Sequence, residues 1–360
     1  MRLFALWLVL FAVYVAGLGI HARTGDELVH LGIAQALIHE HEVVDAPQGA
    51  GFALLISPAR ELDGARGVEL FLAAFAALGF VLSALLARRI APEPYASGGA
   101  ALAGLSAPAI AHAGAIYPEL MAGTLLVGAA VCAMAVRDAP RVAPALGGGA
   151  MLAVLPWLGP LFLLPALPIA AAIYRWSRQG RRPLLGLIAI ELAAASLVVY
   201  ATLNESLYDG PTPWSANPPG VTATGAQSAG DYIERVPRLV TLWVDPDVGL
   251  LRWAPIFALV FVSGWLLWRS RHSQLARVIS ERASAEAAAS LALTVVGVQL
   301  LVAAFLVPAI DGNWFAGRYL APALPTAGAL IAWGLRNAPR PVTAALAALT
   351  LLASAWVLLD

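Results

Sequence analysis

Apolar residues follow one another along this chain in long runs, which charged residues, prolines and glycines separate. Most runs hold close to ~20 residues, the length at which an α-helix crosses the hydrocarbon core of a bilayer. The pattern predicts an all-α, polytopic integral membrane protein with about eleven transmembrane helices. The predicted spans are 3–20, 67–87, 96–115, 119–136, 142–156, 159–175, 183–203, 252–268, 289–308, 319–335 and 341–359.

Two of these spans allow a second interpretation. Pro156 and Pro160 interrupt the apolar residues between 142 and 175, so one long kinked helix is the alternative to two short helices. Residues 3–20 have the position of a secretory signal peptide. Their apolar run is longer than a usual signal-peptide core, and no clean small-residue cleavage site follows it. We therefore predict a retained first helix.

The arginines are distributed unevenly among the segments that join the spans. Most of them lie in short segments on one side of the membrane, which the positive-inside rule identifies as the cytoplasmic side. The N-terminus is then cytoplasmic, and the two long segments, 21–66 and 204–251, are external loops. We predict a single transmembrane domain over 1–360, without a separate soluble domain, in the plasma (inner) membrane.

Composition agrees with this picture and excludes several classes of protein. Hydrophobic residues make up 60% of the chain and charged residues 12%, about half the usual share of a soluble domain. This excludes a disordered chain, a collagen, a nucleic-acid-binding protein and a soluble enzyme. The 22 basic and 22 acidic residues balance, so net charge indicates no partner. A single cysteine, Cys132, excludes a disulfide framework.

The first external loop opens with a helix signal that contains an acidic pair. Thr24 and Glu27 have the spacing of a capping box, and Leu28, Leu31, Ala34, Gln35 and Ile38 then follow a helical period. This predicts an amphipathic helix on the membrane surface. Asp26 and Glu27 in its first turn either complement the helix dipole or supply a general base.

Short motifs recur along the chain in a fixed order. They are Gly25-Asp26-Glu27, Gly51 to Pro58, Tyr117-Pro118-Glu119, Leu155-Pro156-Trp157, Gly249 to Pro255 and Gly317 to Pro325. Together these motifs resemble the GT-C superfamily of membrane glycosyltransferases, which includes protein O-mannosyltransferases, aminoarabinose transferases of lipid A and mycobacterial arabinosyl- and mannosyltransferases. Bacterial members often continue Asp-Glu-Pro-His-Tyr, whereas this chain has Asp26-Glu27-Leu28-Val29-His30.

The resemblance implies an activity and assigns roles to residues. It implies a GT-C-like fold and transfer of a sugar, with inversion, from a polyprenyl-phosphate donor to a hydroxyl of an envelope glycan, lipid or protein. Asp26 corresponds to the candidate catalytic base, with Glu27 as its acidic neighbour. Arg318, followed by Tyr319, corresponds to the residue that holds the lipid phosphate.

Elementary chemistry adds further candidates on the same side of the membrane. His30 shares a helix face with Asp26, Glu119 begins an external helix end, and Trp314 suits the interface, so we predict that these three bind substrate. A divalent cation, Mg²⁺ or Mn²⁺, is a possible cofactor. Asp245-Pro246-Asp247 has the spacing of a metal motif, but such a sequence before Gly249 is more typical of a turn.

Other interpretations stay open. Arg318 could instead be an interfacial anchor whose charge reaches the lipid headgroups. A transporter or flippase would need paired charges within the membrane, and Glu191 is the one candidate deep in an apolar run. A catalytically inactive GT-C-like assembly subunit is the third possibility.

Overall fold

The computed structural model describes residues 2–19, 22–40, 49–216, 224–272, 280–310 and 315–359. Regular secondary structure within these ranges is helical, which confirms the predicted all-α class. Six short helical turns occur at 36–40, 160–162, 213–216, 255–258, 302–306 and 318–323. The α-helices are α1 Arg2–Ala16, α2 Gly25–Gln35, α3 Ala50–Ala87, α4 Tyr95–Gly104, α5 Ala107–Ala113, α6 Glu119–Asp138, α7 Val142–Leu158, α8 Leu163–Gln179, α9 Pro183–Tyr208, α10 Ala229–Glu234, α11 Arg238–Val244, α12 Leu250–Trp253, α13 Leu259–His272, α14 Ser280–Leu301, α15 Leu324–Asn337 and α16 Arg340–Leu359.

The helices are compatible with a multi-pass membrane protein. Among the described residues, 6 helical segments are long and apolar enough to cross a bilayer, and shorter apolar helices accompany them. α7 and α8 are separate helices that Gly159 divides, which decides between the two interpretations of 142–175. The predicted number of spans is not established by these lengths.

α3 differs from the prediction. The sequence predicts that Pro47 to Pro58, too short to span a bilayer, form an interfacial or re-entrant segment apart from span 67–87. The structure instead joins the residues from Ala50 onward and the following span into one long helical element. Asp63 and Gly64 leave helical geometry and kink this element. Gly64 has a φ of +54°, a conformation that glycine adopts without steric penalty. The predicted 96–115 span is likewise broken, into α4 and α5.

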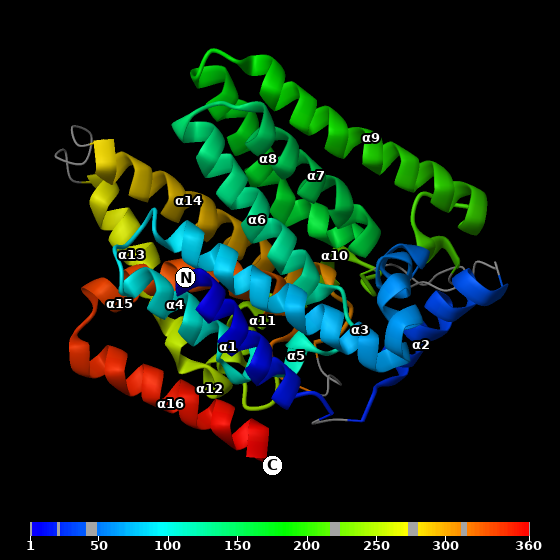
Figure 1. Ribbon diagram of the computed structural model, residues 1–360, viewed down its shortest axis with the longest axis horizontal. Helices are drawn as coiled ribbons and strands as arrows, with labels where there is room; N and C mark the ends of the chain where they lie inside the picture. The colour runs from blue at the N-terminus through cyan, green and yellow to red at the C-terminus, as the bar shows by residue number, and fades with distance from the viewer. Residues whose placement is uncertain are drawn as a thin grey trace.

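Figure 1 shows the helices as one bundle with α9 along one edge and α16 along the opposite edge. α6 lies within the bundle and is mostly buried. Small residues allow the helices of the bundle to approach one another closely. A Cβ at Gly79 of α3, for example, would lie 2.4 Å from the Thr124 hydroxyl of α6. Similar close packing occurs where Gly99 of α4 meets Ala332 of α15. Membrane helices pack by such contacts because hydrophobicity alone does not drive them together in lipid.

Candidate active site

The N-terminus of α2 is fixed by the predicted capping box. The Thr24 hydroxyl accepts a hydrogen bond from the backbone N–H of Glu27, and a Glu27 carboxylate oxygen accepts one from the Thr24 N–H at 2.8 Å. The other Glu27 oxygen accepts a hydrogen bond from the Ile116 N–H, also at 2.8 Å. Glu27 is 1% exposed. Its carboxylate therefore ties α2 to the segment that leads into α6.

α2 buries a face that carries both polar and apolar residues. Glu27, His30, Ile33 and Ala34 are buried. Leu28, the first residue of the predicted apolar row, is 55% exposed, whereas Ala34 of the same row is fully buried. The row is therefore divided between the bundle and the outer surface of α2. The predicted location of this helix at the membrane surface stays a prediction.

His30 occupies a largely apolar environment. Its ring meets the Phe52 ring edge-on, with centroids 5.0 Å apart. Burial lowers the pKa of His30 to about 4, and the nearby Arg318 acts in the same direction, against the opposing effects of Asp26 and Glu27. The imidazole is therefore neutral at pH 7. Its buried Nδ1 atom has no hydrogen-bond partner among the described residues.

Arg318 is the centre of a cluster of charges. Its Nε donates a hydrogen bond to Glu119 at 2.9 Å, and its Nη1 lies 3.5 Å from Asp26. The Arg318 side chain is 14% exposed, that of Glu119 11% and that of Asp26 51%. Burial alone would lower the pKa of Arg318, but the charge of Glu119 and the neighbouring tyrosines raise it above its ordinary value. The guanidinium is a permanent cation.

Local backbone features bring these groups together. Gly317 has a φ of +82° and turns the chain into the helical turn Arg318–Ala323. Glu119 is the first residue of α6, directly after Pro118. One turn further on, a Cβ at Gly123 would lie 2.7 Å from the Pro322 carbonyl oxygen. The absence of a side chain at Gly123 lets these two segments touch, which sets Glu119 beside Arg318.

Tyr117 connects the cluster with α2. Its ring centroid lies 3.7 Å from the Arg318 guanidinium carbon, within the range of a cation–π contact. Its hydroxyl shares a short hydrogen bond with that of Thr24. Burial raises the pKa of Tyr117, so the phenol stays protonated at neutral pH. The Tyr319 ring lies further from Arg318, at 5.5 Å.

A cavity of about 380 Å³ adjoins this cluster. Its lining is mostly apolar and aromatic, with few polar groups. Three buried polar atoms on its walls have no hydrogen-bond partner among the described residues: Glu119 Oε2, His30 Nδ1 and Gln299 Oε1. Buried polar atoms are nearly always paired in proteins, so such a group of exceptions is typical of a ligand site. The aromatic lining residues are Trp157, Phe162, Tyr200, Trp214 and Tyr319.

The predicted site residues mostly come together. Asp26, His30, Glu119, Arg318 and Tyr319 belong to the cluster or the cavity beside it. Glu27 is bound to Thr24 and Ile116 and lines a separate cavity. Trp314 lies outside the described residues. The roles predicted for these side chains stay predictions.

The site contains two further residues, Tyr117 and Gln299, that the sequence patterns did not indicate as candidates. Tyr117 stands in a motif that pointed only to its neighbour Glu119. Gln299 is a lone amide within an apolar run, 3% exposed in α14, and that isolation was the available signal.

A metal site stays a prediction as well. Among the described residues, no three side chains of His, Cys, Asp or Glu lie close enough to hold a metal ion together. Asp245 forms a turn, since its carboxylate accepts hydrogen bonds from the N–H groups of Asp247 and Val248. The turn interpretation of this acidic motif is therefore confirmed.

Comparisons with known proteins agree with the architecture. No protein-family model and no curated protein sequence matches the chain. The structure is similar to the crystal structure of ArnT from Cupriavidus metallidurans bound to undecaprenyl phosphate, with 18% identity and a TM-score of 0.63 over 95% of this chain. The apo ArnT structure gives a TM-score of 0.60 at 18% identity over 94% of this chain. The chain spans about 61% of the length of ArnT. The protein thus has an ArnT-like, all-helical membrane fold.

Proposed function

We propose that the protein is a membrane glycosyltransferase that moves a sugar from a polyprenyl-phosphate donor to a hydroxyl group of an envelope glycan, lipid or protein. The observation that carries this proposal is the position of Arg318, buried between Glu119 and Asp26 beside an aromatic cavity. The ArnT-like fold supports a lipid-phosphate donor, because one of the similar structures contains undecaprenyl phosphate.

Arg318 suits the phosphate of such a donor. A guanidinium is planar, always charged and able to donate two parallel hydrogen bonds to phosphate oxygens. The rings of Tyr117 and Tyr319 both lie within cation–π range of it. As the bond between the sugar and the phosphate breaks, negative charge develops on the phosphate, and the buried cation stabilises it.

The cavity suits a sugar. Aromatic rings such as those of Trp157 and Tyr200 present flat apolar surfaces to the C–H face of a sugar ring. The unpartnered atoms of Glu119, His30 and Gln299 offer hydrogen bonds to its hydroxyl groups. Filling the cavity with a sugar would therefore pair polar atoms that are otherwise buried without partners.

Asp26 is the better of the two acidic residues for the role of base. Both Glu27 oxygens already accept backbone hydrogen bonds, whereas the Asp26 side chain is 51% exposed and accessible to an acceptor. Asp26 would take the proton of the acceptor hydroxyl while the acceptor oxygen attacks the anomeric carbon of the donor sugar. The bond from that carbon to the phosphate oxygen then breaks, the polyprenyl phosphate leaves, and the linkage is inverted. Glu27 positions the helix that holds the base.

We further propose the plasma (inner) membrane as the location, with this site on the external face. Nucleotide sugars are cytoplasmic, so an external site requires a donor that the lipid delivers across the membrane. The sugar, whether mannosyl or arabinosyl, and the requirement for Mg²⁺ or Mn²⁺ belong to the same set of proposals.

The decisive experiment compares the wild type with Asp26→Asn in a transfer assay. Each purified protein receives a labelled polyprenyl-phosphate sugar and a cell-envelope extract. We expect transfer by the wild type and a loss of about 100-fold or more in the variant, the usual contribution of a general base. The matched control is Asp209→Asn, because Asp209 is exposed and asparagine tolerates its left-handed backbone equally well.

Each other outcome has a defined meaning. Equal transfer by the wild type and Asp26→Asn would exclude Asp26 as the base. Absence of transfer by the wild type with any polyprenyl-phosphate sugar would contradict the enzyme and favour the transporter or the inactive subunit. Uptake of labelled donor into proteoliposomes would then separate these two.

A further inference from the structure

Gln299 of α14 is a buried amide on the wall of the cavity of about 380 Å³. The residue is 3% exposed. Its Nε2 donates a hydrogen bond to the Tyr319 carbonyl oxygen at 2.9 Å, whereas its Oε1 has no hydrogen-bond partner in the part of the chain that the structure describes. An unpaired buried amide oxygen is unfavourable, so this atom points to a ligand that pairs it.

The Tyr319 carbonyl fixes which end of the Gln299 amide is left for a ligand. A carbonyl oxygen only accepts hydrogen bonds, so turning the amide over would set two acceptors against each other. The amide nitrogen therefore stays with Tyr319, and the amide oxygen stays unpaired. A ligand at this position of the cavity must bring a hydrogen-bond donor.

Glu119 provides a second acceptor in the same cavity. Its Oε1 accepts the hydrogen bond from Arg318 Nε, and its buried Oε2 has no partner among the described residues. Glu119 is thus bonded to Arg318, and Gln299 is bonded to the next residue of the chain, Tyr319. Both unpaired acceptors are therefore held beside the turn that carries the cation.

This arrangement favours contact with the sugar that is joined to the phosphate. The inference rests on the proposed function, in which Arg318 holds the phosphate of the donor. The donor sugar is bonded directly to that phosphate, so its ring lies next to the residues that contact Arg318 and Tyr319. Ring hydroxyl groups are the hydrogen-bond donors that the oxygens of Gln299 and Glu119 lack.

Charge restricts the class of sugar further. Among the described residues that line the cavity, Arg318 is the only arginine, and the carboxylates of Glu119 and Asp26 already contact it. The donor phosphate adds another negative charge. A carboxylate on the sugar would lie near Glu119 without a cation of its own, and like charges repel strongly where little water screens them.

We propose that Gln299 and Glu119 select the donor sugar, each by accepting a hydrogen bond from one of its hydroxyl groups. The sugar therefore carries hydroxyl groups near the anomeric carbon and no carboxylate, which excludes uronic acids. A site built to bind a hydroxyl group rejects the analogue that lacks it, because the buried groups of the site are then left unpaired.

The test measures the binding of donors to the wild type in detergent micelles, apart from transfer. The probes are polyprenyl-phosphate mannose and arabinose, the monodeoxy analogues of each, polyprenyl-phosphate mannuronate and polyprenyl phosphate itself. We expect one parent donor to bind more tightly than polyprenyl phosphate, and two of its monodeoxy analogues to bind about tenfold more weakly than that parent, the effect of one lost hydrogen bond. The mannuronate donor should bind at least about tenfold more weakly than the mannose donor.

Gln299→Met then identifies the hydroxyl group that Gln299 contacts. Methionine is similar in length and volume but has no acceptor oxygen. The variant should bind the parent donor about tenfold more weakly and should no longer distinguish it from one of the two analogues, because both changes remove the same hydrogen bond. Thr294→Val is the matched control, since it removes an exposed hydroxyl from the same helix outside the cavity. Unchanged binding of polyprenyl phosphate to Gln299→Met would show that Arg318 is still in place.

Each contrary result has one meaning. Equal binding of the parent donors and all their monodeoxy analogues by the wild type would overturn the inference, whatever the variants do, because water would then serve these oxygens equally well. Parent donors that bind no better than polyprenyl phosphate would overturn it too. Tight binding of the mannuronate donor would overturn the exclusion of uronic acids, and full discrimination by Gln299→Met would exclude Gln299 as its cause. The expected binding pattern without transfer would contradict only the proposed function.

Discussion

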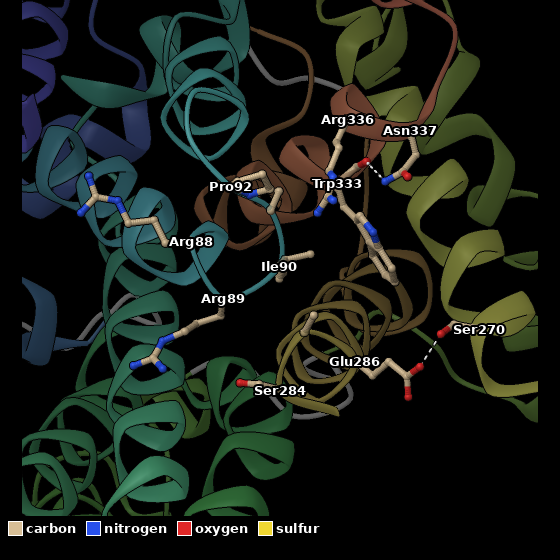
Figure 2. A pocket seen from close by; sticks show the side chains of 12 residues that line it. Arg88, Arg89, Ile90, Pro92, Ser270, Ser284, Glu286, Trp333, Arg336 and Asn337 are labelled. Carbon is tan, nitrogen blue, oxygen red and sulfur yellow. Dashed lines mark hydrogen bonds between the residues drawn. The ribbon is translucent and has the colours of Figure 1, made fainter. Parts of the chain in front are cut away.

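The two ends of α3 border two cavities that hold arginines in different ways. The cavity near Gly51 measures about 380 Å³ and contains the 14% exposed side chain of Arg318. The cavity at Arg88 and Arg89 is larger, about 720 Å³. Figure 2 shows these two arginines pointing away from Trp333 and Glu286 on its other wall. Hereafter these are the Arg318 cavity and the Arg88 cavity.

The partners of the arginines explain the difference. Arg88 bonds Glu93, five residues away, and its side chain is 36% exposed. Arg89 bonds Asp138, 49 residues away, and its side chain is 40% exposed. Arg318 contacts carboxylates that lie 199 and 292 residues away in the chain; its side chain is 14% exposed, that of Glu119 11% and that of Asp26 51%. Holding a buried charge between distant segments requires much of the fold, whereas exposed local ion pairs contribute little. Burial of the arginine side chain, more than cavity size, therefore distinguishes the Arg318 cavity from the Arg88 cavity.

The largest expected effect comes from removing the buried cation. Arg318→Ala should lower transfer by about 100- to 1,000-fold, because the phosphate leaving group loses its electrostatic stabilisation. The control in the Arg88 cavity is Arg336→Ala, since Arg336 is exposed. Initial rates with a labelled polyprenyl-phosphate sugar measure both. Similar losses in the two variants would break the distinction between the cavities.

Much of the fold could be predicted because its causes are local. Runs of about 20 apolar residues specify spanning helices wherever they occur. The capping box of Thr24 and Glu27 forms within a single turn, so its sequence signal sufficed. The sequence did not predict that the segment before Pro58 and the following span form one kinked helix, α3. The eight or so apolar residues before Pro58 look too short to belong to that span.

The site depended on information that local patterns do not contain. Nothing in the spacing of Asp26, Glu119 and Arg318 pairs them. The family resemblance pointed to Asp26 and Arg318, and the predicted topology put all three on one side of the membrane. The face that α2 buries depends on specific partners, such as the Ile116 N–H that binds Glu27, and apolar periodicity contains no information on them. Tyr117 was missed because an aromatic residue at a membrane boundary is ordinary there.

The second largest effect concerns how stability depends on pH through His30, which lines the Arg318 cavity. The pKa of His30 falls from 6.5 in the unfolded chain to about 4 in the folded protein, so the unfolded state binds more protons between these values. Stability is therefore fully present above pH 6.5 and is lost as the pH falls toward 4. At pH 5 the loss from His30 is about 2 kcal/mol.

His30→Leu tests this prediction, because leucine cannot titrate. The free energy of unfolding in detergent micelles, compared between pH 7 and pH 5, should fall less in this variant than in the wild type by about 2 kcal/mol. His39→Gln is the control, since the His39 side chain is 55% exposed. An unchanged pH dependence in His30→Leu would show that His30 is not buried as a neutral group.

The smallest effect separates the two contacts of Tyr117. Tyr117→Phe keeps the ring against Arg318 but removes the hydroxyl that binds Thr24, so the donor KM should stay constant while kcat falls about threefold as α2 and Asp26 lose a tether. Tyr117→Leu also removes the ring, and the donor KM should then rise about tenfold because Arg318 is less well oriented. Identical kinetics of the two variants would mean that the ring contact contributes nothing, and the Arg318 cavity would then differ from the Arg88 cavity only in its carboxylate partners.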